Sequence, residues 1–126
     1  MRLESIDHLV ITTRDLKACL HFYVDILGME HEIFGEGRHL LRFGREKINI
    51  HTRVGEFALA GKHADYGCQD FCLIAEGDIH EIYAELREKG APLATGITPQ
   101  EGARGKMDSV YLYDPDGSLV EIAVYR

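Results

Sequence analysis

The sequence predicts an α+β fold made of two copies of one β-α-β-β-β unit. Two observations carry this prediction. Strand-like and helix-like segments follow each other in the same order in both halves of the 126 residues. Acid or imidazole side chains also recur, because Asp70 lies 62 positions after His8 and Glu121 lies 70 positions after His51. Duplication of one half explains this symmetry, and a bound metal explains the residue types.

The first repeat is predicted over about residues 4–53. Ser5–Thr12 alternates in the way of a strand that is buried on one face. Asp15 is suited to cap a helix, apolar side chains then recur at helical spacing, and Gly28 ends the pattern, which predicts a helix over roughly residues 15–27. Three short strands are expected after it: Met29–Phe34, His39–Phe43 and Lys47–Thr52.

The second repeat is predicted over about residues 68–125, after a polar linker at about residues 54–67. A strand at Asp70–Ala75 precedes a helix from Asp78 to about Lys89. Thr98–Met107 is rich in glycine and bears two cations, so it is expected to be a mobile lid or an anion-contacting loop. The remaining strands are expected at Ala91–Ile97, Ser109–Tyr113 and Ser118–Val124, with a turn at Asp114-Pro115-Asp116-Gly117.

Length and composition indicate a single domain, residues 1–126, of the ordinary globular type, with 45% hydrophobic and 28% charged residues. No apolar run approaches the ~20 residues of a membrane span, and no secretory signal is recognisable. The expected compartment is therefore the cytoplasm, where an odd number of cysteines, three, suits reduced thiols. The net charge of -7 argues against a nucleic-acid partner.

Three motifs identify a family resemblance that covers the whole chain. They are the opening Asp7-His8-Leu9-Val10-Ile11, the helix end Phe22-Tyr23-x-x-x-Leu27-Gly28-Met29, and the ending Asp114-Pro115-Asp116-Gly117-Ser118-Leu119-Val120-Glu121-Ile122. With the element order, they resemble the vicinal oxygen chelate superfamily, which includes glyoxalase I, fosfomycin-resistance thiol transferases, extradiol dioxygenases and bleomycin-sequestering proteins. Within this superfamily, one branch contains glyoxalase domain-containing protein 5 and virulence-associated bacterial proteins. The chain resembles that branch in two segments, Lys47–His51 and Gln69–Ile74.

The resemblance implies that each repeat curls into half a barrel and that the two form a cupped, mixed sheet. A divalent ion (Zn, Ni, Mn or Fe) at its base would stabilise an oxyanion of a substrate that chelates it through two neighbouring oxygens. The ligands implied are His8, His51, Asp70 and Glu121, with His51 and Glu121 also catalytic. His51 stands where glyoxalase I has a carboxylate, for which an imidazole is a sound substitute.

Each ligand has an alternative interpretation. His8 can be a hydrogen-bonded core histidine, and Glu121 can pair with an arginine such as Arg104 or face solvent on an edge strand. Asp70 is the doubtful member because the superfamily usually has histidine there. Its shorter side chain can hydrogen-bond backbone or hold a ligand imidazole from behind.

The function favoured is a small metal-dependent enzyme of the lyase, isomerase or transferase type, resembling lactoylglutathione lyase. The two residues that anchor glutathione in glyoxalase I are replaced by Thr12 and Gly55, so glutathione conjugates are expected to be poor substrates. A facial triad of His8, His51 and Glu121 would suit an extradiol dioxygenase, although the second-half histidine of that family is absent.

Substrate contacts are expected from four residues: Thr12, Arg104, Lys106 and Tyr111. The alternative function is a metal-free module that sequesters a small molecule, as bleomycin-binding relatives do. In either case the partner is a small molecule rather than nucleic acid or membrane, and short chains of this superfamily usually form a homodimer.

Overall fold

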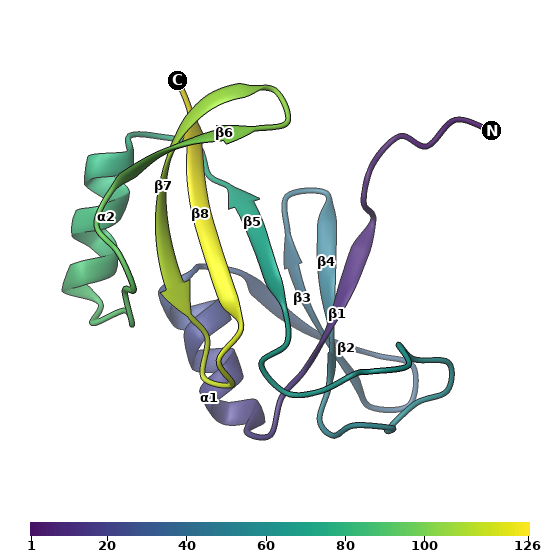
Figure 1. The fold of residues 1–126 in the computed structure, drawn as a ribbon. Coiled ribbons are helices and arrows are strands. Elements are labelled where there is room, and N and C mark those ends of the chain that lie inside the picture. Colours follow the sequence, from purple (N-terminus) through teal and green to yellow (C-terminus); the bar gives the residue numbers. More distant parts are fainter. The chain divides into compact units, whose positions relative to one another are not determined.

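The computed structural model describes all residues, Met1–Arg126, and divides into two compact units, Met1–Gly67 and Cys68–Arg126. Each unit contains one strand, one helical segment and three further strands, which confirms the predicted α+β fold with two equivalent repeats (Figure 1). Each repeat builds a four-stranded mixed sheet of its own. No helix is both long enough and apolar enough to cross a membrane.

The helical segment of the first unit comprises α1 (Leu16–Leu20) and its π-helical continuation η1 (His21–Ile26), close to the predicted range. Asp15 begins it by accepting a hydrogen bond from the backbone N–H of Ala18 at 3.1 Å. Gly28 ends it with a φ of 78°, a conformation that glycine adopts without strain. The side chains that it buries most deeply are Cys19, Phe22, Tyr23 and Ile26.

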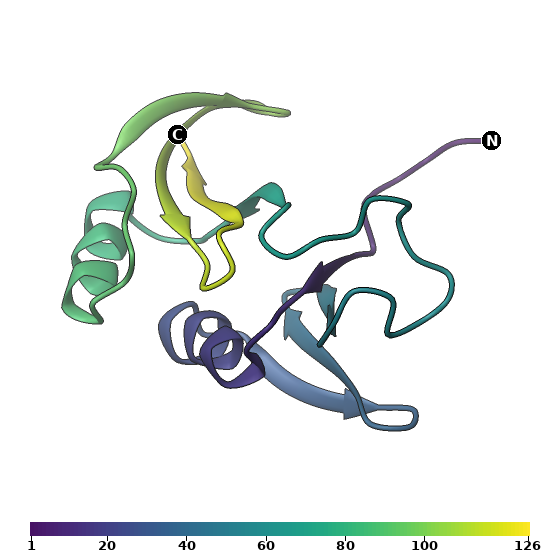
Figure 2. The same cartoon turned by 60° about the horizontal axis from the view of Figure 1, so that its bottom comes forward.

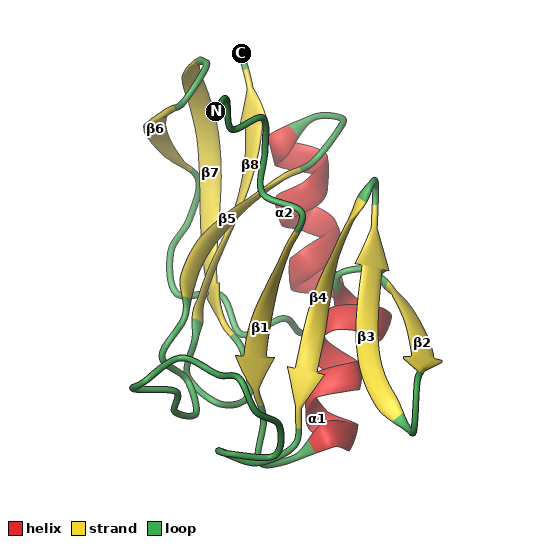
Figure 3. Ribbon diagram, turned by 90° about the vertical axis from the view of Figure 1, so that its right-hand side faces the viewer, coloured by secondary structure: helices red, strands yellow, loops and turns green.

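The sheet of the first unit has the order β1-β4-β3-β2, in which β1 and β4 are parallel and the other pairs antiparallel. Its strands are β1 (His8–Thr12), β2 (Glu30–Phe34), β3 (Arg38–Phe43) and β4 (Glu46–His51). One face carries the buried Ile11, Leu41, Ile48 and Ile50. His31 is in register with Leu41, so its side chain points to this apolar face. Residues of the helical segment line a groove together with His31, so the segment covers the apolar face. Figure 3 shows α1 behind β4 and β3.

The second unit repeats this topology, with the order β5-β8-β7-β6 and β5 parallel to β8. Its elements are β5 (Asp70–Ile74), α2 (Ile79–Glu88), β6 (Thr98–Gly102), β7 (Gly105–Tyr113) and β8 (Leu119–Tyr125). Asp78 caps α2 by accepting hydrogen bonds from the backbone of His80 and Glu81 at 2.8 and 3.2 Å. Figures 1 and 2 both show α2 beside β7.

Two predictions about the second unit were wrong. The expected strand at Ala91–Ile97 is irregular and contributes only a single bridge from Leu93 to Leu112. The expected mobile loop Thr98–Met107 is instead the β6–β7 hairpin. Glycine serves close packing there: a Cβ on Gly102 would lie 2.5 Å from the Tyr125 hydroxyl.

The turn predicted between the last two strands is confirmed. Asp114 is buried at 6% exposure, and its carboxylate accepts hydrogen bonds from the backbone N–H groups of Asp116 and Ser118 at 3.0 and 2.9 Å. Gly117 completes the turn with a φ of 101°. This local hydrogen bonding brings the chain back to begin β8, the strand that carries Glu121.

Candidate functional site

The face of the first sheet turned away from α1 carries the predicted site residues of the first unit. Strand alternation and register place His8 beside Lys47 and Thr12 beside His51 on this face. The two histidines are therefore four positions apart along neighbouring strands, which corresponds to about 13 Å of strand. Between them lies Asn49, in register with Val10.

His8 is not a core histidine. Its side chain is 43% exposed, and Nδ1 lies 2.7 Å from the Asp7 carboxylate. The imidazole is thus held by a neighbouring acid at one nitrogen, while the other remains available for a ligand. A carboxylate that orients a ligating imidazole in this way is a common feature of metal sites.

His51 is nearly buried, at 7% exposure, and its ring meets the Phe57 ring edge to face at 5.0 Å between centroids. Burial lowers the pKa of His51; nearby Glu56 opposes this shift and Arg38 adds to it. The imidazole is therefore neutral at pH 7, and a neutral ring nitrogen has the lone pair that metal ligation or proton acceptance needs.

The second unit brings Cys72, Glu121 and Tyr111 into one row across β5, β8 and β7. Glu121 Oε1 is buried and has no hydrogen-bond partner, and the carboxylate forms no ion pair with Arg104. Partial burial of the thiol, together with the charge and the hydrogen bonding of the neighbouring Glu121, raises the pKa of Cys72 to about 12. Burial and Glu121 also raise the pKa of Tyr111. The row concentrates one negative charge beside two groups that keep their protons.

Asp70 begins β5 two positions before Cys72 on the same face, and it is exposed. Its charge is a minor cause of the raised pKa of Tyr111, smaller than the burial of that side chain and the effect of Glu121. Its backbone pairs with Leu119, so it lies one step along the face from the row that contains Glu121.

The register changes the symmetry argument made from the sequence. Two positions after Asp70 comes Cys72, which pairs with Glu121. Two positions after His8 comes Val10, which pairs with Asn49. The structural counterpart of Glu121 is thus Asn49, and the mirrored placement of His51 was wrong. Asn49 Oδ1, like Glu121 Oε1, is buried without a hydrogen-bond partner. The sequence held the signal, because Ile48-Asn49-Ile50 matches Val120-Glu121-Ile122 in pattern.

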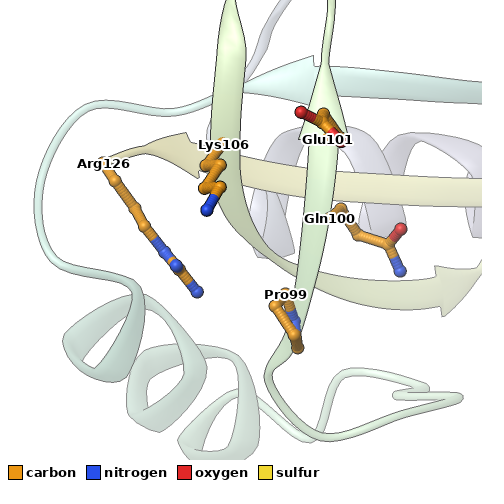
Figure 4. A pocket seen from close by; sticks show the side chains of 5 residues that line it. All are labelled: Pro99, Gln100, Glu101, Lys106 and Arg126. Atoms are coloured by element: carbon orange, nitrogen blue, oxygen red, sulfur yellow. The ribbon is translucent and has the colours of Figure 1, made fainter.

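The two cations expected to contact substrate lie in the β6–β7 hairpin. The Arg104 guanidinium stacks on the Tyr125 ring, 4.5 Å from its centroid. Lys106 is on the face of β7 opposite to Tyr111, where it lines a pocket with Arg126 (Figure 4). Arg126 is paired with Asp108 through two hydrogen bonds of 3.1 and 2.8 Å. Lys106 and Tyr111 therefore serve different surfaces of this unit.

No three His, Cys, Asp or Glu side chains gather closely enough in this structure to hold a metal ion. The individual donors nevertheless fit one chemically. Glu121 offers a buried oxygen without a partner, and His51 offers a nitrogen that is neutral at pH 7. Asn49 was missed by the sequence analysis and adds a second buried oxygen of the same kind.

Comparison with known proteins gives consistent matches over the whole chain. The family model described as Glyoxalase/Bleomycin resistance protein/Dioxygenase superfamily matches residues 5–122. Virulence protein STM3117 of Salmonella typhimurium is 35% identical over 99% of this chain and 87% of its own, and its crystal structure superposes with a TM-score of 0.96, with 100% of each chain covered.

Two further proteins are similar. Glyoxalase domain-containing protein RDO1 of Mycosarcoma maydis is 36% identical over 100% of this chain and 71% of its own. The crystal structure of lactoylglutathione lyase from Agrobacterium tumefaciens has a TM-score of 0.73 at 22% identity, over 98% of this chain and 96% of that one. The latter likeness concerns the fold alone.

Proposed function

Because the chain belongs to the glyoxalase/bleomycin resistance protein/dioxygenase superfamily, we propose that it is a divalent-metal-dependent, glyoxalase-like enzyme acting on a small oxygenated substrate. The observation that carries the proposal is Glu121 Oε1, a buried carboxylate oxygen with no hydrogen-bond partner. Leaving such an acceptor unsatisfied costs about 1–3 kcal/mol, so its retention is explained by a cation or a substrate proton that it meets in the working enzyme.

The proposed ligands are His8, His51, Asp70 and Glu121, which are donors suited to zinc, nickel, manganese or iron. When bound, the ion would supply Lewis-acid stabilisation of negative charge that develops on a substrate oxygen. Among the side chains, neutral His51 and the Glu121 carboxylate are the proton acceptors, and Asp7 orients the imidazole of His8.

The test is elemental analysis of protein prepared without a histidine tag and saturated in turn with zinc, nickel, manganese and iron. About one ion per chain is expected, and His8→Ala combined with Glu121→Ala should abolish binding. The control is His63→Ala, because His63 is exposed and outside the proposed ligand set, so its loss should leave the metal content unchanged. Absence of stoichiometric metal with all four ions would refute the proposal.

The second candidate is a metal-free protein that sequesters a small molecule. It is supported by the family model, whose description includes bleomycin resistance proteins. The same elemental analysis separates the candidates, because a sequestering module of this kind would hold no stoichiometric metal with any of the four ions.

A further inference from the structure

Two cations and two aromatic rings form a cluster on the face of the first sheet that carries His51. The guanidinium of Arg38 lies 4.1 Å from the centroid of the Phe57 ring and 5.2 Å from that of Phe34. The Lys47 ammonium lies 4.8 Å from the same Phe34 centroid. We call Phe34, Arg38, Lys47 and Phe57 the cationic patch.

Neither cation of the patch has a carboxylate partner within ion-pair distance. The nearby acids are engaged elsewhere: Glu32 pairs with Arg42, and Glu56 accepts hydrogen bonds from Thr52. Lys47 acts on Asp7 only at longer range, as a minor cause of the lowered pKa of that carboxyl group.

The patch holds two like charges close together. The Lys47 ammonium and the Arg38 guanidinium lie 4.8 and 5.2 Å from the centroid of Phe34, so they are at most about 10 Å apart. Their mutual repulsion is unfavourable, and an anion between them would relieve it. The rings hold the cations in place without neutralising them, and stacked guanidinium keeps its N–H edges free for a bidentate partner.

Asn49 provides an independent sign that a ligand belongs on this face. It lies between Lys47 and His51 on β4, it is 9% exposed, and its Oδ1 has no hydrogen-bond partner. A buried carbonyl oxygen calls for a donor, such as a hydroxyl group. Leu40, in register with Asn49, is buried beside it and gives the face an apolar floor.

We propose that the cationic patch binds the acidic group of the substrate, and that the substrate is a small organic hydroxy-carboxylate. Arg38 and Lys47 hold the carboxylate, Asn49 Oδ1 accepts a hydrogen bond from the hydroxyl group, and Phe34, Phe57 and Leu40 contact the carbon skeleton. Inorganic anions would leave the apolar side chains unused. This inference names the substrate class of the proposed function and rests on it.

Isothermal titration calorimetry of the full chain, both as purified and after treatment with EDTA, tests the inference with three probes: 2-hydroxybenzoate, phenol and inorganic phosphate. We expect 2-hydroxybenzoate to bind in both preparations and phenol and phosphate to bind about tenfold more weakly or worse. Arg38→Gln and Lys47→Gln should each weaken binding of 2-hydroxybenzoate about tenfold. Arg38→Lys keeps the positive charge, so it should lower the affinity for 2-hydroxybenzoate less than Arg38→Gln does. Arg87→Gln is the matched control, because Arg87 also faces a ring, that of Tyr83, but lies on α2.

Several results would overturn the inference: no binding of 2-hydroxybenzoate, equal binding of phenol or phosphate, or unchanged affinity in the Arg38→Gln, Lys47→Gln double variant. If a glutamine variant fails to fold, as judged by circular dichroism, Arg38→Lys and Lys47→Met replace it. Failure of the metal proposal can be told apart from failure of this inference. The former would appear as a lack of stoichiometric metal in the elemental analysis, while EDTA-treated protein would still bind 2-hydroxybenzoate. Stoichiometric metal without selective binding of the hydroxy-carboxylate refutes the substrate class alone.

Discussion

Replacing Glu121 with methionine should stabilise the metal-free protein. The substitution keeps the length of the side chain but removes a carboxylate of which one oxygen is buried without a hydrogen-bond partner. An orphaned buried polar atom costs about 1–3 kcal/mol, but Cys72 and Tyr111 also lose a carboxylate that hydrogen-bonds to them, so Glu121→Met should raise the free energy of unfolding by at most an amount in this range. For a chain of this length, that corresponds to an increase in Tm on the order of 3–10 °C.

Thermal and urea unfolding of EDTA-treated protein, followed by circular dichroism, would measure the change. Glu121→Gln is the matched variant: its amide still presents an oxygen to the same surroundings, so the gain should be smaller. Added metal should raise the Tm of the natural sequence, since a ligand that binds only the folded state stabilises it, but should leave Glu121→Met unchanged. A Glu121→Met protein that is less stable than the parent would show that the carboxylate supports the fold, and the reasoning would fail.

Four further predictions concern the same residues. Because its pKa is about 12, Cys72 should react with iodoacetamide at pH 8 at least a hundredfold more slowly than an unstructured thiol, and mass spectrometry of labelled peptides should show a faster reaction in Glu121→Met. Because the pKa of His51 is lower in the folded state than in the unfolded chain, the native state binds fewer protons near this pH, and the free energy of unfolding should fall as the pH drops below about 6.5. An NMR titration in which the His51 imidazole resonances show an ordinary pKa would refute this. If sites are shared in a homodimer, mixing His8→Ala with Glu121→Ala chains should restore one metal per dimer, whereas failure of every mixture would confine each site to one chain. The hemithioacetal of methylglyoxal and glutathione should be a poor substrate, and kcat/KM near the upper end of the ~10⁴–10⁸ M⁻¹s⁻¹ range of enzymes would contradict this.

The elements that could be predicted are those whose signals are local. Asp15 and Gly28 bound the first helical segment, and the aspartate that begins the turn before β8 makes its hydrogen bonds within four residues. The π-helical turns of η1 and the exact burial pattern were not predicted, because apolar spacing alone does not reveal where a helix changes its hydrogen bonding.

The hairpin at Thr98–Met107 shows why other features could not be predicted. Glycines and a proline indicate a loop when only neighbours in sequence are considered. Here Gly102 is needed because the side chain of Tyr125, far along the chain, occupies the space beside it. That requirement exists only after β8 has paired with β7.

The candidate site was predicted in kind but not in detail. Glu121 was identified because a carboxylate inside an apolar strand is unusual, and the structure leaves its buried oxygen without a partner. Asn49 was missed although its local pattern matches that of Glu121, because the pairing of β1 with β4 and of β5 with β8 is needed to choose this match over the one with His51. The cationic patch was missed for the same reason, since its members come from β2, β3, β4 and the segment after β4.

The equivalence of Asn49 and Glu121 has an evolutionary consequence. After a duplication the two halves begin identical, and each can then diverge without disturbing the backbone that they share. Here one copy carries a charged group and the other a neutral amide at the same point of the same scaffold. A single change, Asn49→Glu, would return the chain to a symmetric pair of carboxylates.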